Sequence, residues 1–242
     1  MFIQDRLGMI EGTETMLAQE RRLDQIANNL ANVNTAGFKK EDVTFWEMMF
    51  KTADNRERVG KGLQVITDLK QGGAEQTGSP LDFAINGPGF FKIQTPSGVR
   101  YTRDGNFTLN SQGQLSTADG NLVLGDGGAV TLPNQHVQVG RDGQITADGK
   151  PIGRLDIVTF VDPQGLEKEG NSLFRPKDAT VAEQPLEAPN VQQGFLEGSN
   201  VNTVAELTEM IDVQRAYQSQ QKAIQTTDEL DQQSTSRVGK LT

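Results

Sequence analysis

Apolar residues recur at helical spacing near both ends of the chain. Near the start, one residue in every seven is apolar over five repeats: Phe2, Met9, Met16, Leu23 and Leu30. A seven-residue apolar repeat keeps one seam of a helix turned toward a partner helix. The pattern predicts a helix within residues 1–36 that ends near Thr35, because Gly37 offers the left-handed conformation that terminates helices.

A second helix is predicted over residues 200–242. Two apolar rows run along it at three- and four-residue steps, one with Val204, Leu207 and Ile211 and the other with Met210, Val213, Tyr217 and Ile224. Thr203 stands three residues before Glu206, which is the spacing of a capping box, so the helix is expected to start at Thr203.

Both apolar stripes require burial, because an isolated helix cannot bury its own apolar face. Three partners are possible: the other helix, the middle of the chain, or neighbouring subunits. An ordinary helical hairpin inside one globule and a polymer subunit both satisfy this requirement.

Residues 37–80 are interpreted as an extended connector with mixed charges and several glycines. One short apolar patch interrupts it, at Phe45, Trp46, Met48, Met49 and Phe50. The patch is either a small satellite core or, in a polymer, a surface that faces a neighbour.

Residues 81–199 read as short strands separated by turns. Asp-Gly pairs, which suit tight hairpins, occur at residues 104–105, 119–120, 126–127, 142–143 and 148–149. Closely spaced hairpins form antiparallel pairs, which favours a barrel or a sandwich. The predicted class is therefore α+β, with discontinuous N- and C-terminal helices and a central, mostly antiparallel all-β domain. Candidate strands are residues 90–94, 99–102, 107–110, 122–124, 137–139 and 155–160.

Charge and composition limit the kinds of partner and the chemistry that the chain can have. The formal net charge of −9, with scattered acidic residues, argues against nucleic acid. No run approaches the roughly 20 apolar residues of a membrane span, so no membrane insertion is expected. The first residues lack the pattern of a secretory signal. Cysteine is absent, which excludes disulfides and thiolate chemistry.

A search for catalytic chemistry yields weak signals. His136 is the only histidine, and it stands without a matching carboxylate or cysteine motif. The glycines at residues 87–89 and 125–128 have neither the spacing nor the following helix of a phosphate loop, and turn glycines explain them better. No catalytic residue, cofactor site or metal site is predicted.

Four stretches point to a family. Residues 27–39 (Ala-Asn-Asn-Leu-Ala-Asn-Val-Asn-Thr-Ala-Gly-Phe-Lys) resemble the N-terminal motif of bacterial flagellar rod and hook proteins. Three further stretches agree with this resemblance in the family's order and extend it over nearly the whole chain: residues 81–91, residues 101–107, and residues 198–202 leading into 210–217.

The resemblance implies a structural subunit of the flagellar basal-body rod, not an enzyme. In this family the terminal helices pack as a coiled coil that lines the inner tube, and the β-domain faces outward. The implied partners are other rod proteins, copies of the same chain and the flagellar type III export apparatus. The implied location is the rod across the periplasm, reached without a cleaved signal peptide.

Two sets of residues are expected to carry assembly. Gly37 and Phe38 should set the direction in which the connector leaves the first helix. The expected assembly motif is Asn28, Asn29, Leu30, Asn32, Thr35, Gly37 and Phe38. The expected helix-packing stripe is Met9, Met16, Leu23, Leu30, Val204, Leu207, Ile211, Tyr217 and Ile224.

Alternatives remain at the level of the sequence. The short stretch between Gly37 and Leu81 resembles the proximal rod group of the family, although Ile211–Tyr217 fits the distal group equally well. A peptidoglycan-active enzyme would need two carboxylates about 5 to 10 Å apart, which the many acidic residues do not exclude. A monomeric adhesin or binding module is a third reading.

Overall fold

The computed structural model describes residues 2–51, 57–133, 137–178 and 180–238, without the side chains of residues 2–11, 45–51, 57–61, 231 and 233–238. His136 and the side chains of Met9 and of the patch at residues 45–50 therefore lie outside the description. The chain divides into two compact units. The helical unit comprises Met1–Ala31, Glu41–Ile66 and Asn202–Thr242, and the β-unit comprises Asn32–Lys40 and Thr67–Val201.

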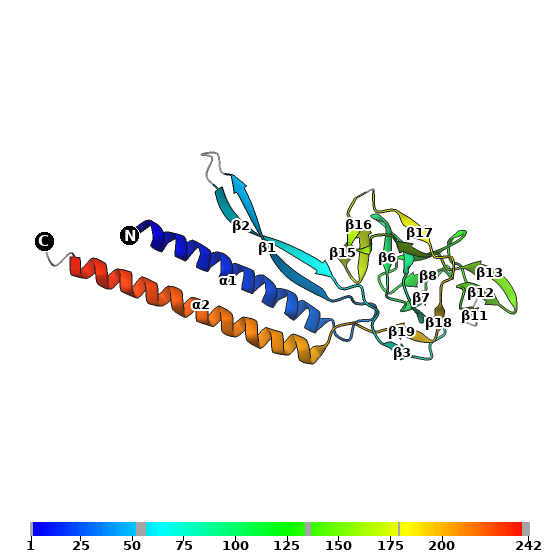
Figure 1. Ribbon diagram of the computed structural model, residues 1–242. Helices are drawn as coiled ribbons and strands as arrows, with labels where there is room; N and C mark the ends of the chain where they lie inside the picture. Colours follow the sequence, from blue (N-terminus) through cyan, green and yellow to red (C-terminus); the bar gives the residue numbers. More distant parts are fainter. Residues whose placement is uncertain (1, 52–56, 134–136, 179, 239–242) are drawn as a thin grey trace. The chain divides into compact units, whose positions relative to one another are not determined.

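Two long helices, α1 (Phe2–Ala31) and α2 (Thr203–Val238), lie side by side in the helical unit (Figure 1). They run antiparallel. Gly12 packs near Gln220 and Ile224, whereas Arg22, further along α1, bonds Glu209, earlier on α2. Within the described residues, neither helix has an apolar stretch long enough to cross a membrane.

The start of the second helix is confirmed at Thr203, whereas the end of the first helix needs correction. Helix α1 ends at Ala31 rather than near Thr35, and the chain then turns, with the Thr35 amide donating to the Asn32 carbonyl (3.1 Å). Helix α2 begins at Thr203 as predicted, but its capping side chain is that of Asn202, which accepts from the Ala205 amide (3.1 Å). The Glu206 carboxylate is buried and accepts from Asn29 of α1 (3.2 Å).

The helical unit also contains a two-stranded sheet of β1 (Glu41–Lys51) and β2 (Glu57–Thr67). These strands occupy the range for which the sequence predicted an extended connector. The Thr44 hydroxyl donates to the Gln64 carbonyl across the pair (3.1 Å). Extended chain is therefore present here, but as a paired ribbon.

The β-unit confirms the predicted α+β class with a central antiparallel β-domain, since the strand pairings described within it are antiparallel. Its largest sheet has the order β15-β16-β6-β5-β9-β8-β7, with β10 beside β9, β14 beside β5, and β17 beside β14. A short helical turn, η1, spans Pro163–Gly165. The strands are β3 (Ala74–Gln76), β4 (Phe83–Ile85), β5 (Phe90–Thr95), β6 (Gly98–Thr102), β7 (Phe107–Leu109), β8 (Leu115–Thr117), β9 (Leu122–Gly125), β10 (Gly128–Ala129), β11 (Val137–Val139), β12 (Gln144–Ala147), β13 (Lys150–Arg154), β14 (Ile157–Phe160), β15 (Leu166–Gly170), β16 (Leu173–Pro176), β17 (Glu183–Pro185), β18 (Val191–Gln193) and β19 (Phe195–Glu197).

Strand β5 separates two apolar cores. Successive side chains of a strand point to opposite faces, so Phe91 and Ile93 enter the larger core while Phe90 enters the smaller one. Strand β14 does the same with Ile157 and Val158. Burial on both faces explains the adjacent apolar residues Phe90 and Phe91 in β5 and Ile157 and Val158 in β14. The smaller core consists of Phe90, Tyr101, Val158, Phe160, Leu166 and Phe174.

The Asp-Gly pairs other than Asp104-Gly105 lie in hairpin turns, each between two successive strands that pair with each other. Asp148 and Gly149 both have positive φ, at 51° and 75°, and form the two-residue turn between β12 and β13. This is the backbone that a tight primed hairpin turn requires. Asp104-Gly105 is different, because it connects β6 and β7, which are not neighbours in the sheet.

The two faces of α2 give a matched test of helix pairing. We expect Val213→Ala, on the face toward α1 (7% exposed), to lower the free energy of unfolding of the helices by about 1.5 kcal/mol, from lost apolar burial. Ile211→Ala (50% exposed) should change it by less than about 0.5 kcal/mol. Both replacements gain similar helix propensity. Urea titration followed by helical circular dichroism measures the difference, and equal effects would contradict the pairing face.

Candidate functional site

Asn29 of α1 binds the start of strand β1 as a backbone amide would. Its side-chain Nδ2 donates to the Glu41 carbonyl (2.9 Å), and its Oδ1 accepts from the Glu41 amide (3.1 Å). Nδ2 also lies 3.2 Å from the buried Glu206 carboxylate of α2. One asparagine thereby fixes the register of α1 against both β1 and α2.

The helix-packing stripe divides between the two faces of α2. Tyr217 and Ile224 are half-buried on the side of Val213, together with Met16, Leu23 and Leu30 of α1. Val204 (74% exposed), Leu207 (44%) and Ile211 instead form a row, here called the outer row, that is solvent-exposed in the single chain. The stripe is thus two surfaces, of which one has an intrachain partner.

The predicted assembly motif is spread over both units. Asn28 and Leu30 lie on α1 beside Asn29, with Asn28 exposed and Leu30 half-buried. Asn32 and Thr35 are joined by a hydrogen bond between their side chains (3.2 Å) at the surface of the β-unit. Gly37 and Phe38 are buried within the β-unit.

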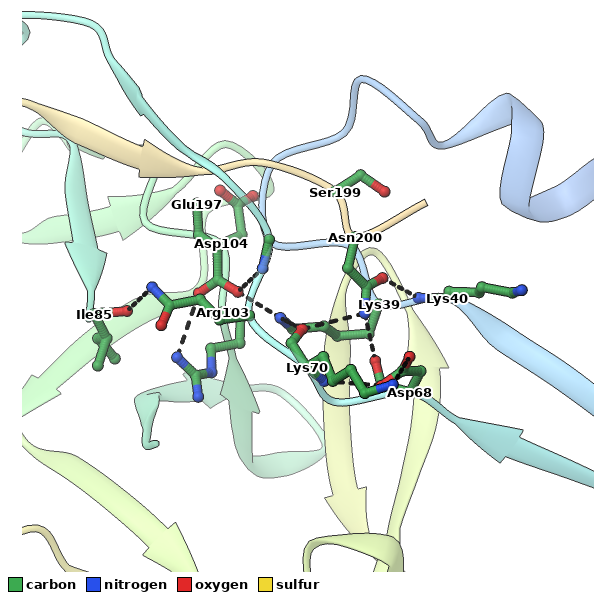
Figure 2. A network of polar contacts seen from close by, with 12 residues as sticks. Lys39, Lys40, Asp68, Lys70, Ile85, Arg103, Asp104, Glu197, Ser199 and Asn200 are labelled. Carbon is green, nitrogen blue, oxygen red and sulfur yellow. Dashed lines mark hydrogen bonds and ion pairs between the residues drawn. The ribbon is translucent and has the colours of Figure 1, made fainter. Parts of the chain in front are cut away.

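Directly after Phe38, the chain enters a buried ionic network (Figure 2). Neither Lys39 nor Glu197 has any exposed side-chain surface, and the two form an ion pair. The Glu197 carboxylate also accepts from the guanidinium of Arg103 (3.3 Å) and from the amide of Gly72 (3.1 Å). Lys39 Nζ donates a second bond to the Lys70 carbonyl (2.7 Å).

The position of Glu197 follows from strand pairing. Glu197 ends β19 and lies opposite Ala74 of β3, which brings its carboxylate next to Gly72. Its backbone carbonyl accepts from the Gly37 amide (2.7 Å), so the turn after α1 is bound at the same place. Arg103 arrives from the end of β6, with its guanidinium 5.1 Å from the centre of the Phe90 ring.

Asn200 extends this network by one step. Its Oδ1 accepts from the Lys40 amide (2.7 Å), and its Nδ2 donates to the carbonyls of Asp68 (2.7 Å) and Lys70 (3.1 Å). The Asp68 amide in turn donates to the Lys40 carbonyl (2.8 Å). Figure 2 shows Asn200 between the segments that carry Lys40 and Asp68.

The electrostatics of the network are unbalanced, because two buried cations share one buried carboxylate. Burial lowers the pKa of the Lys39 ammonium below its usual 10.5, although the attraction of Glu197 opposes this shift. Burial likewise lowers the pKa of Arg103 against the opposing attraction of Glu197. The charge of Glu197 is therefore the one that both cations depend on.

This arrangement is suited to holding chain segments together. A lysine with a lowered pKa is a candidate nucleophile in an open cleft. Lys39 has no exposed surface, however, and its amine is occupied by Glu197 and Lys70. The ammonium of Lys168 covers the neighbouring backbone. It donates to the Lys39 carbonyl (3.0 Å) and lies 3.4 Å from the centre of the Phe38 ring.

Sequence reasoning did not single out Lys39, Arg103 or Glu197. Lys39 and Arg103 stand inside stretches that carry the family resemblance, and Glu197 directly precedes one. The signal that was available is a charged residue within or beside an otherwise apolar and turn-forming motif. Such a residue is exposed, functional or paired, and only the fold reveals its partner.

Three family models match separate parts of the chain. The model described as "Flagella basal body rod protein" matches residues 12–39, and "Flagellar hook protein FlgE/F/G D1 domain" matches residues 84–147. "Flagellar basal body rod FlgEFG protein C-terminal" matches residues 192–237. Each matched stretch supplies one charge to the network, respectively Lys39, Arg103 and Glu197.

Similar curated proteins align over most of their length. Flagellar basal-body rod protein FlgF of Caulobacter vibrioides is 40% identical over 238 residues, which covers 95% of this chain and 97% of the relative. FlgG of Bacillus subtilis is 39% identical over 251 residues, covering 92% and 95%. FlgF of Mesorhizobium japonicum is 33% identical over 209 residues, covering 84% and 86%.

Gly37 gives a test of the turn that precedes the network. It has φ of +66°, and an added Cβ would overlap the backbone of Arg103 and Asp104. Positive φ alone costs a residue with a Cβ about 1 to 2 kcal/mol. We expect Gly37→Ala to lower the free energy of unfolding of the β-unit by more than this, because the backbone must also shift.

Gly78→Ala is the matched control. Gly78 has φ of +73°, but no atom lies within 4 Å of the added Cβ, so only the conformational cost applies. Amide exchange of the β-unit in the two variants, followed as a function of urea concentration, measures both costs. Equal losses would show that the close approach of Gly37 to Asp104 has no energetic weight.

Proposed function

We propose that this chain occupies the proximal part of the bacterial flagellar rod. It belongs to the family of flagellar basal-body rod proteins and is a structural subunit of that rod. The family is structural rather than enzymatic. Because the chain belongs to this family, it is expected to assemble with other rod proteins. The proximal position is the finer part of the proposal, with the distal position as the alternative.

One observation supports the proximal assignment. Identity does not separate the two groups, at 40% for FlgF and 39% for FlgG. The alignment with FlgG, however, runs over 251 positions and so exceeds the 242 residues of this chain, whereas the alignment with FlgF runs over 238. FlgG therefore contains positions that this chain lacks, in agreement with the short stretch between Gly37 and Leu81.

The outer row of α2 is the surface proposed to contact neighbouring subunits. Val204, Leu207 and Ile211 expose apolar area on a helix whose opposite face already packs on α1. Burying such a row against further copies or other rod proteins would give a helical bundle. We propose that this bundle is the coiled coil of the inner tube, with the β-unit outside it.

Export is the remaining part of the proposal. The family resemblance implies passage through the flagellar type III export channel without a cleaved signal peptide and a final position across the periplasm. The absence of cysteine is compatible with folding in an oxidising compartment, since no thiol is available for mispairing. The expectation of export by this route rests on membership in the rod family.

Complementation tests the position in the rod. Expressed in a strain that lacks its proximal rod protein FlgF, the chain should restore rod completion and swimming, because it would fill the position that the missing subunit leaves. In the matched strain that lacks FlgG, swimming should remain absent. Swimming motility in soft agar and electron microscopy of basal bodies measure the outcome. Rescue of only the FlgG-deficient strain would overturn the proximal assignment.

The outer row is tested by placing a charge on it. Ile211→Asp should leave the monomer folded, because Ile211 is half-exposed, but should abolish rod assembly, since burying an unpaired carboxylate costs several kcal/mol even after the surroundings relax. Gln218→Asp places the same charge on an exposed position of α2 beyond the apolar row and should preserve swimming. Normal swimming of the Ile211→Asp strain would remove this row from the assembly surface.

A further inference from the structure

The buried network lies close in sequence to the points where the chain passes between its two units. The chain makes this passage four times, after residues 31, 40, 66 and 201. Lys39 and Lys40 precede the second passage, Asp68 and Lys70 follow the third, and Asn200 precedes the fourth. The first passage opens the turn in which the Gly37 amide bonds the Glu197 carbonyl.

We propose that Glu197 and Asn200 form a clamp within the β-unit, which holds together the chain segments next to these passages. The clamp opens as one cooperative step while the two apolar cores stay folded. The clamp consists of residues 37–40, 68–72, Arg103 and 197–200. This proposal is separate from the position of the subunit in the rod, because it concerns the local stability of the single chain.

Shared partners are the reason to expect one step rather than several. Glu197 accepts from three segments at once, through Gly37, Lys39, Gly72 and Arg103. The Lys70 carbonyl accepts from both Lys39 and Asn200, which joins the ionic half of the clamp to the amide half. Displacing the segment that carries the Lys70 carbonyl therefore breaks a bond in each half, and it leaves the buried Lys39 ammonium with one partner fewer, which is costly.

The apolar cores are not built from the clamp. The buried residues of both cores belong to the stretch 81–191, and the clamp contributes none of them. Three clamp residues touch the edges of the cores: Leu69 packs against the smaller core, Gln71 donates to the Ile85 carbonyl (3.2 Å), and Arg103 lies against the face of Phe90. Opening of the clamp therefore leaves the cores with their own packing, which is the condition for a local rather than a global event.

The charges predict which clamp variants are severe. Replacing Glu197 by Gln removes the one carboxylate bonded to both cations and leaves Lys39 and Arg103 facing each other, with only the partly exposed Asp68 carboxylate nearby. Replacing Lys39 by Met leaves one cation and one anion, Arg103 and Glu197, which remain a neutral pair. Glu197→Gln should therefore be the more disruptive variant, and adding Lys39→Met to it should restore part of the loss.

Hydrogen exchange of the purified full chain tests the clamp, with the amides of Gly37, Lys40, Asp68 and Gly72 as its reporters. Each of these amides is bonded inside the clamp. We expect Glu197→Gln to accelerate exchange of all four by about 100-fold, and Lys39→Met by less. The amides of Leu115 and Val130, bonded within the larger core, should keep their wild-type rates.

Asn200→Ala tests cooperativity without altering charge. It removes three hydrogen bonds, none of them to Glu197 or Gly72, yet the Gly72 amide should exchange faster along with that of Lys40. Gln193→Ala is the matched control. Gln193 also makes three hydrogen bonds, to Pro80, Val137 and Val139, and its loss should leave the clamp amides unchanged.

Three outcomes would overturn the clamp. In the first, Asn200→Ala affects Lys40 alone, and the bonds are independent. In the second, the core amides accelerate together with the clamp amides, and the network is one part of a global unfolding unit. In the third, no clamp amide responds to Glu197→Gln. Because the measurement uses the isolated chain, its result is separate from success or failure in restoring swimming.

Discussion

A carboxylate without exposed surface must be paired, and Glu197 meets this requirement through parts of the chain that lie far apart in sequence. Its ion pair with Lys39 spans 158 residues and its bond to Arg103 spans 94. These residues come from the three stretches that the three family models match separately. The stretches are thus parts of one structure, since the partner of each buried charge is supplied by another.

The local part of this fold could be predicted from the sequence. The Asp-Gly pairs located hairpins such as the turn at Asp148-Gly149, and apolar runs located β5, β6, β9 and β11. Both helices were also evident from their period. These signals are read within a few residues, where backbone preferences and side-chain alternation act directly.

Features that depend on distant partners were missed. Glu206 stands at capping-box spacing, but its carboxylate is buried and accepts from Asn29 on the other helix, and the capping side chain of α2 is that of Asn202. Periodicity marked both apolar rows of α2 alike, and only packing distinguishes Val213, which faces α1, from Ile211, which is exposed. This difference separates the face that packs within the chain from the row that we propose for assembly.

The bond between the Asp68 amide and the Lys40 carbonyl has an evolutionary consequence. It closes the base of everything between residues 40 and 68, and Asn200 reinforces this closure from a third segment. Once the ends of a segment are joined, lengthening it adds only a slowly growing loop entropy, about 0.6 kcal/mol for each doubling. Insertions and deletions between these residues can therefore be accepted without rebuilding the β-unit, which makes this ribbon the place where the length of such a subunit is free to diverge.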